Sequence, residues 1–304
     1  MIFSVTILGS NSATPTPGRH PTSQLINHQH RLFLADCGEG TQMQLKKQNI
    51  RFGKINHILI SHLHGDHFYG LIGLVMTYHL FGREQPLHIY GPEGIRDIID
   101  IQLKASQTRL VYPLHIHVVD TETPSAVYED DLLEITTIPM IHRVPTCGYL
   151  FREKPRDRKM KPGIVNKLQI PVDLIGSIKK GQDYNDSNGK LYQNTEITLE
   201  PPPPRIYAFC SDTIYQEPVA EIVKNADLLY HEASFMHDRI EMAHEKFHST
   251  TIEAATLALK ANAKKLIIGH YSARYDDLKP LLAEARSVFP NTFLATEGAC
   301  FEIE

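Results

Sequence analysis

The sequence contains no long apolar run. None of its stretches approaches the roughly 18 or more apolar residues that a membrane-spanning helix needs. Residues 1–8 show no basic region followed by the apolar core of a signal peptide. With 304 residues, of which 42% are hydrophobic, the chain is nevertheless long enough to bury a substantial core. We therefore expect a folded, soluble, cytoplasmic protein with no membrane partner.

Cysteines are few and far apart. The four of them, Cys37, Cys147, Cys210 and Cys300, form no C-x-x-C pair. This spacing favours neither a disulfide framework nor a cysteine zinc site. Histidine, by contrast, occurs 17 times, and it is the commonest metal ligand in proteins. The positions of the histidines must show which of them could bind a metal.

The chain also lacks an overall positive charge. Its net charge of −4 excludes a uniformly basic surface of the kind that coats nucleic acid. Residues 152–181, however, contain nine Lys or Arg and three Asp or Glu, a local charge of +6, so the remainder carries −10. This asymmetry predicts a local basic patch.

Short stretches rich in β-branched residues alternate with helical patterns, which predicts an α/β fold. The expected strands cover residues 4–8, 31–34, 57–60, 87–90, 132–138, 206–209, 228–230 and 266–268. The expected helices include residues 94–104, 217–225 and 252–261, the last introduced by a capping box of Thr250 and Glu253.

Residues 152–204 break this rhythm. They are basic, then rich in Asp, Asn and Gly, and end in four consecutive prolines at positions 201–204. We expect these residues to form no dense core and interpret them as an arm inserted into a single domain. The proline tract would be a stiff, extended segment that leads back to the next strand. A solvated loop without function is the alternative.

Several expected strands end in a polar residue that could bind a metal. These residues are His62, Asp212, His231 and His270. Because sites in open α/β sheets form beyond the carboxyl ends of the strands, residues distant in sequence could meet at one edge.

The strongest pattern is the cluster His62-Leu63-His64-Gly65-Asp66-His67, directly after a strand. Three imidazoles and a carboxylate cannot share an apolar core without polar partners. The cluster therefore predicts a site for zinc or a similar ion rather than a chance surface group. Four ligands on one short loop can hardly complete two coordination shells, so we add His142, Asp212 and His270 as candidates.

Other histidines have simpler interpretations. His115 and His117 alternate along a strand, and we expect them to face one side of the sheet in a structural role. His28 and His30 lie in an expected hairpin turn, and His57 and His88 match no ligand position.

Residues 60–71 (ISHLHGDHFYGL) resemble the signature of metallo-β-lactamase-fold hydrolases, and in wording they resemble the ribonuclease Z family. Other stretches that resemble the family occur in the same order along nearly the whole chain, at residues 8–10, 36–42, 231–235, 248–250 and 269–275. The arm matches only in part, because residues 169–174 depart from the glycine- and proline-rich tip of the family.

The resemblance implies a four-layer αββα sandwich over residues 1–304, with the basic arm at about 152–204. It implies two zinc ions per subunit, one bound by His62, His64 and His142, the other by Asp66, His67 and His270, with Asp212 bridging both. It also implies that Asp66 is the general base and that His248, assisted by Glu232, protonates the leaving group.

The activity implied is that of a zinc-dependent endoribonuclease that removes the 3′ trailer from precursor tRNA. A metal-activated hydroxide would attack the phosphodiester, leaving a 3′-hydroxyl on the tRNA and a 5′-phosphate on the trailer. The resemblance further implies a homodimer whose arm grips tRNA. The alternative is a relative that hydrolyses a small ester, lactam or cyclic nucleotide, which needs no basic arm. A metal-binding module without catalysis is disfavoured because Asp66 and His248 are both present.

Overall fold

The computed structural model describes the whole chain, residues 1–304. The chain divides into two compact units, which are described separately. The main unit comprises residues 1–128, 135–151 and 205–304, and the inserted unit comprises residues 129–134 and 152–204.

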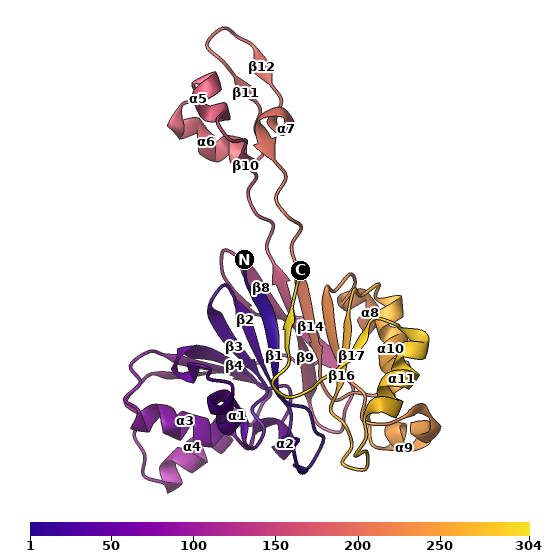
Figure 1. Ribbon diagram of the computed structural model, residues 1–304. Coiled ribbons are helices and arrows are strands. Elements are labelled where there is room, and N and C mark those ends of the chain that lie inside the picture. Colours follow the sequence, from indigo (N-terminus) through magenta and orange to yellow (C-terminus); the bar gives the residue numbers. More distant parts are fainter. The chain divides into compact units, whose positions relative to one another are not determined.

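Two seven-stranded sheets form the centre of the fold (Figure 1). In spatial order the first sheet contains β18 (Cys300–Glu302), β1 (Phe3–Gly9), β2 (Ser23–His28), β3 (Arg31–Ala35), β4 (Ile55–Leu59), β5 (Leu87–Gly91) and β6 (Leu114–Val118). The second contains β17 (Thr292–Leu294), β16 (Leu266–Gly269), β15 (Leu228–Glu232), β14 (Ile206–Cys210), β9 (Thr146–Glu153), β8 (Leu133–Met140) and β7 (Ala126–Glu129). Strands β3 to β6 are parallel, as are β14 to β17.

Helices cover the outer face of each sheet (Figure 1). Those beside the first sheet are α1 (Thr41–Lys47), α3 (Leu71–Leu80) and α4 (Ile95–Ala105), and those beside the second are α8 (Val219–Ile222), α10 (Thr251–Lys260) and α11 (Lys279–Val288). Two further short helices are α2 (Gly65–Phe68) and α9 (Ile240–Glu245). The order helix, sheet, sheet, helix is the four-layer αββα arrangement expected from the sequence. The helices are too short or too polar for any of them to span a membrane.

The alternation of side chains along each strand explains the layering. In β3, Leu34 packs into the apolar cluster formed with helices α1, α3 and α4. Its neighbour Phe33 points to the opposite face, where its ring lies 5.8 Å from that of Phe151 in the second sheet. Because successive side chains of a strand face opposite ways, one sheet can pack against helices and a second sheet at once.

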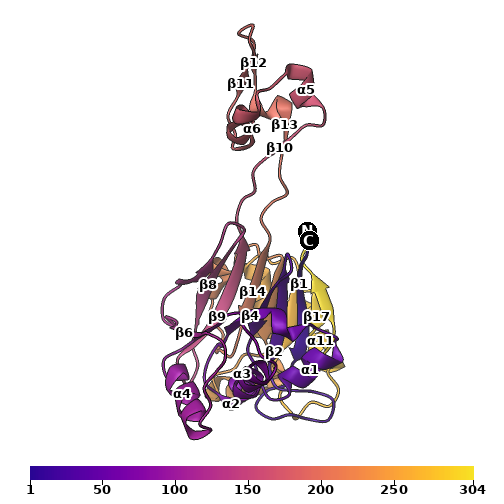
Figure 2. The ribbon, with the colours of Figure 1, turned by 90° about the vertical axis from the view of Figure 1, so that its left-hand side faces the viewer.

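The two ends of the chain meet in the first sheet. Ser4 of β1 pairs with Glu302 of β18, so the N- and C-terminal strands are neighbours (Figure 2). The eight strands and the capping box of Thr250 and Glu253 predicted from the sequence are confirmed. The helix expected over residues 217–225 is wrong in length, because α8 has only four residues.

The inserted unit has secondary structure of its own. It contains β10 (Lys159–Met160), α5 (Ile164–Leu168), α6 (Val172–Lys179), β11 (Tyr184–Asn185), β12 (Leu191–Tyr192), α7 (Asn194–Ile197) and β13 (Thr198–Leu199). The expectation that this segment forms no core is wrong. A small apolar cluster buries Ile170, Ile178, Tyr184 and Ile197 together. It packs residues 170–178 against residues 184–197.

Candidate metal centre

Seven residues that follow strands converge at one edge of the main unit. His62 and His64 lie in the loop after β4, Asp66 and His67 lie in α2, and His142, Asp212 and His270 follow β8, β14 and β16. These are the seven ligands expected from the sequence, and the fold brings all of them together. His231, also considered a candidate, does not join them. It is buried within β15, and its Nδ1 hydrogen-bonds the backbone oxygen of Glu232.

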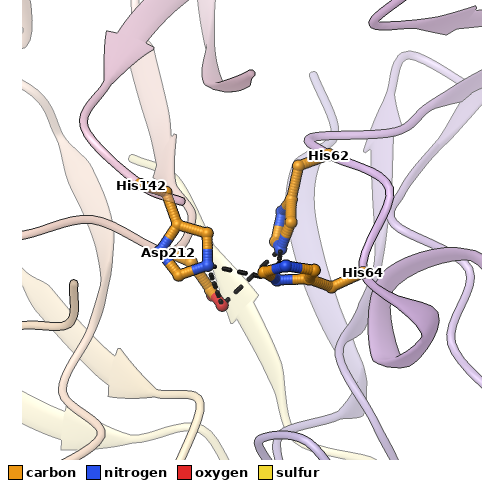
Figure 3. Close-up of side chains that lie close together, drawn as sticks. All are labelled: His62, His64, His142 and Asp212. Atoms are coloured by element: carbon orange, nitrogen blue, oxygen red, sulfur yellow. Dashed lines mark hydrogen bonds and ion pairs between the residues drawn. The ribbon is translucent and has the colours of Figure 1, made fainter. Parts of the chain in front are cut away.

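The first group consists of His62, His64, His142 and Asp212, whose side chains point toward one another (Figure 3). Nδ1 of His64 lies 3.1 Å from Nε2 of His62 and 3.1 Å from Nε2 of His142. Oδ2 of Asp212 is 3.7 Å from Nε2 of His62. Three ring nitrogens and one carboxylate oxygen thus surround a single point, as the ligands of a tetrahedral ion do.

The second group consists of Asp66, His67 and His270. Nε2 of His67 lies 3.3 Å from Nε2 of His270 and 3.5 Å from Oδ2 of Asp66. Asp212 also reaches this group, because its Oδ1 is 3.2 Å from Nε2 of His270. Asp212 therefore lies between the two groups, with one oxygen near each.

Outer partners fix the orientation of four of the histidines. The Nδ1 atoms of His62, His67, His142 and His270 lie within hydrogen-bond distance of Ser61 Oγ, Asp36 Oδ2, the Phe247 backbone oxygen and Ser234 Oγ, at 3.0, 2.7, 2.9 and 2.9 Å. Each ring is thereby tied on one side and presents Nε2 to the centre. Such outer hydrogen bonds orient metal-binding imidazoles.

Asp36 is the outer partner whose role the sequence did not reveal. It is fully buried, follows β3, and has a φ of 57°. Its Oδ1 accepts a hydrogen bond from the backbone N–H of Ser61, which holds the start of the loop that carries His62 and His64. A non-glycine residue with positive φ is uncommon, and here the two hydrogen-bonded oxygens hold the conformation in place.

Charge is concentrated in this centre. Burial alone would raise the pKa of Asp212, but His270, His67 and His62 hold it well below its usual range. Burial opposes the protonation of His67, yet Asp212, Asp66 and Asp36 raise its pKa well above the usual value. Several buried carboxylates and imidazoles thus depend on one another for charge compensation, as is typical of ligands arranged around a cation.

His248 and Glu232 form a pair beside these groups. Nδ1 of His248 lies 2.9 Å from Oε1 of Glu232. Burial lowers the pKa of His248, but Glu232 and Asp212 outweigh it and raise the pKa to about 9. The fully buried Glu232 also accepts hydrogen bonds from the backbone of Thr213 and from Ser234. The pair can therefore hold a proton on His248 at neutral pH.

A cavity of about 220 Å³ opens over the centre. It is lined by Ser12, Ala13, His64, Asp66, His142, Arg143, Asp212, Lys246, His248 and His270. The sequence patterns did not predict Arg143 and Lys246 as site residues. Arg143 follows His142 directly, and Lys246 lies two residues before His248. Two cations beside the candidate metal ligands favour an anionic substrate such as a phosphate ester.

The donor set fits divalent metal ions. Imidazole nitrogens and carboxylate oxygens are the ligands that zinc accepts. The buried Oδ1 of Asp212 accepts no hydrogen bond, and an ion would satisfy it. Asp212, His248 and His270 form a third set close enough to share an ion, so the geometry alone leaves His248 as a possible ligand.

Comparison with known proteins identifies the family. Over 301 residues the chain is 45% identical to ribonuclease Z of Bacteroides fragilis, with 99% of each chain covered. It is 44% identical to ribonuclease Z of Porphyromonas gingivalis over 97% of each chain. The chain belongs to the ribonuclease Z family.

The solved structures agree. The crystal structure of the short form of human tRNase Z matches with a TM-score of 0.71 and 26% identity, covering 99% of each chain. The metallo-β-lactamase-fold protein YhfI of Bacillus subtilis matches with a TM-score of 0.69 and 21% identity, covering 99% of this chain and 100% of that one, and shares the fold. The family model described as anti-Pycsar protein Apyc1 matches residues 3–153. Members of the ribonuclease Z family are hydrolases of the metallo-β-lactamase fold, and so is this chain.

Proposed function

We propose that this protein is a zinc-dependent endoribonuclease that removes the 3′ trailer from precursor tRNA. The observation that carries the proposal is the presence of two groups of candidate metal ligands that share Asp212 beside the His248–Glu232 pair. Full-length similarity to ribonuclease Z supports the choice of RNA as the substrate.

In this proposal His62, His64 and His142 would hold one zinc ion, Asp66, His67 and His270 would hold the other, and Asp212 would contribute to both. Two such ions, when bound, supply an activated water and neutralise the charge that builds up on the phosphate. The residues themselves fix the geometry, because their outer hydrogen bonds leave little freedom to the rings.

Asp66 is proposed as the general base. Its Oδ2 accepts a hydrogen bond from the backbone N–H of Ala13, which anchors the carboxylate at the wall of the cavity. Nearby His67 and His270 keep its pKa below the usual value despite burial. The carboxylate is therefore ionised and able to orient an attacking water or accept its proton.

His248 is proposed as the general acid, positioned by Glu232. Since Nδ1 faces Glu232, Nε2 is the nitrogen left to donate a proton to the departing ribose 3′ oxygen. Attack by water on phosphorus does not need the neighbouring 2′-hydroxyl. The products are then a tRNA with a free 3′-hydroxyl and a trailer with a 5′-phosphate.

The inserted unit is proposed as the arm that grips tRNA. Lys154, Arg156 and Arg158 are paired with Glu129, Glu153 and Glu200. Lys167 and Lys180 are exposed and form no ion pair, so they are free to contact phosphates. By family resemblance we also propose a homodimer in which the arm of one subunit serves the other, and a cytoplasmic location, where precursor tRNA is found.

The decisive experiment compares substrates. Purified protein is incubated with a 3′-extended precursor tRNA and with a panel of small esters, lactams and cyclic nucleotides, with and without chelator. We expect chelator-sensitive removal of the trailer and at most slow hydrolysis of the panel. Rapid hydrolysis of a panel member with no cleavage of the precursor would overturn the proposal and favour the small-substrate alternative.

A further inference from the structure

Four histidines outside the metal centre lie on neighbouring strands of the first sheet. They are His57 in β4, His88 in β5, and His115 and His117 in β6. The parallel register pairs His57 with His88 and His88 with His115. His117 lies two residues further along β6, so its side chain returns to the same face.

The rings of these residues are in contact. The ring centroids of His57 and His88 are 5.2 Å apart, and those of His88 and His115 are 4.9 Å apart. Nδ1 of His88 lies 3.0 Å from Nε2 of His117. His115 and His117 are exposed and His88 is half-buried, so this end of the row is open to solvent.

The spacing of the two nitrogens suits a shared metal ion. Two cis ligands at zinc-to-nitrogen distances of about 2.0–2.1 Å lie roughly 2.9–3.4 Å apart. In the metal centre of this chain, the nitrogens of His62 and His64 are 3.1 Å apart. The planes of the His88 and His117 rings differ by only 13°, whereas those of His62 and His64 differ by 80°. The exposed His117 ring must therefore turn to admit an ion.

The surroundings of His88 and His117 disfavour the protonated form of each ring. Burial, His115, His117 and Arg83 lower the pKa of His88, and burial, His115 and Arg96 lower that of His117. A neutral imidazole carries a lone pair that a metal can use. No ion pair joins a carboxylate to this cluster, so its donor set consists of imidazole nitrogens.

We propose that His88 and His117, with His115 as a third ligand after a rotation of its side chain, form a second metal site on the first sheet. Imidazole ligands without carboxylates select zinc, nickel or copper over magnesium or calcium. The bound ion links β5 to β6, the last strand of the sheet, and so stabilises an edge strand. The site is independent of the proposed ribonuclease activity, because none of its residues belongs to the metal centre.

Equilibrium dialysis against Zn²⁺ at pH 7.5, followed by elemental analysis, tests the proposal. The full-length protein should hold one zinc per chain more than the variants His88→Gln and His117→Gln. The matched control is His30→Gln, which replaces an exposed histidine in the β2–β3 turn and should hold as much zinc as the wild type. All variants should cleave RNA at the wild-type rate.

Equal zinc contents in the wild type, His88→Gln and His117→Gln would overturn the proposal. Should His88→Gln fail to fold, the exposed His117 still provides the test. A second measurement uses Cu²⁺ added to the zinc-loaded protein. Its electron paramagnetic resonance spectrum should show coupling to at least two nitrogens, and this signal should be lost in His117→Gln. A spectrum unchanged by this substitution would also refute the site.

Discussion

Replacing His248 by Ala should slow the cleavage of precursor tRNA by roughly 100- to 10,000-fold, the usual contribution of a general acid. The reason is that the ribose 3′ oxygen is a strong base and leaves slowly without a proton. His248 makes one side-chain contact within 3 Å, to Glu232. Because His248 is proposed as the proton donor and not as a zinc ligand, its removal should leave the zinc content unchanged.

The leaving group decides whether His248 is the proton donor. A p-nitrophenyl phosphodiester releases a weakly basic oxygen that departs without protonation. His248→Ala should therefore hydrolyse it at nearly the wild-type rate while cleaving RNA slowly. The assay compares kcat for both substrates. An equal loss on both substrates would refute the proton-donor role, and loss of zinc would place His248 among the metal ligands instead.

Glu232→Gln provides the companion variant. Each oxygen of Glu232 accepts hydrogen bonds, one from Thr213 and His248, the other from Ser234. The glutamine side chain has only one acceptor oxygen. Its amide nitrogen must therefore face either Thr213 and His248 or Ser234, where a donor already stands. We expect a loss of about 1–3 kcal/mol in the free energy of unfolding. His248→Ala should also lower the free energy of unfolding, because it leaves the buried Glu232 carboxylate without its cationic partner. If Glu232 acts through His248, the double variant should be no slower than His248→Ala.

Five further outcomes are expected. Elemental analysis of protein never exposed to chelator should give about two zinc ions per chain from the metal centre, apart from any held by His88 and His117. A value of zero or one in His88→Gln protein would contradict the binuclear centre. Asp66→Ala should lose turnover together with part of this metal. The variant Lys167→Gln/Lys180→Gln should bind precursor tRNA more weakly and with a shallower salt dependence, while hydrolysing a small phosphodiester normally; unchanged tRNA affinity would count against the arm. Mass spectrometry should find a 3′-hydroxyl on the tRNA and a 5′-phosphate on the trailer, whereas a 2′,3′-cyclic phosphate would show that the 2′-hydroxyl attacks. Burial and neighbouring His88 lower the pKa of His57 to about 4, below the usual value near 6.5. Between these two pH values the unfolded chain binds more protons than the folded one, so the free energy of unfolding should fall by up to about 3 kcal/mol as the pH falls from 6.5 to 4. Urea titrations of His57→Phe should show a smaller fall, and an equal fall would show that His57 is not its origin.

The sequence predicted the residues of the candidate metal centre because each of them stands in a short, recognisable pattern. His62, His64, Asp66 and His67 are adjacent, and His142, Asp212 and His270 each follow a strand, so parallel strands bring them to one edge. Asp36 also follows a strand, but many polar residues do. Its role depends on the pairing of β3 with β4, which places its carboxylate beside Ser61 and His67. No local pattern specifies that pairing.

The inserted unit was harder to predict for a different reason. Its core residues Ile170, Ile178, Tyr184 and Ile197 are separated by polar and charged stretches. The spacing of these apolar residues follows neither the 3.6-residue period of a helix nor the two-residue period of a strand for long enough to predict a buried face. The small core forms only when residues near both ends of the segment come together, as in the pairing of β10 with β13.

The place where the inserted unit leaves the main unit determines which parts of the fold it can affect. It connects β9 to β14, which are neighbours in the second sheet. A β carbon added to Gly148, near the start of β9, would touch the backbone of Phe209 and Cys210 at the end of β14, so the two strands run in opposite directions. The connection therefore replaces what could be a simple hairpin turn. A change in the length of this segment therefore need not shift the opposite strand ends, which carry His142 and Asp212.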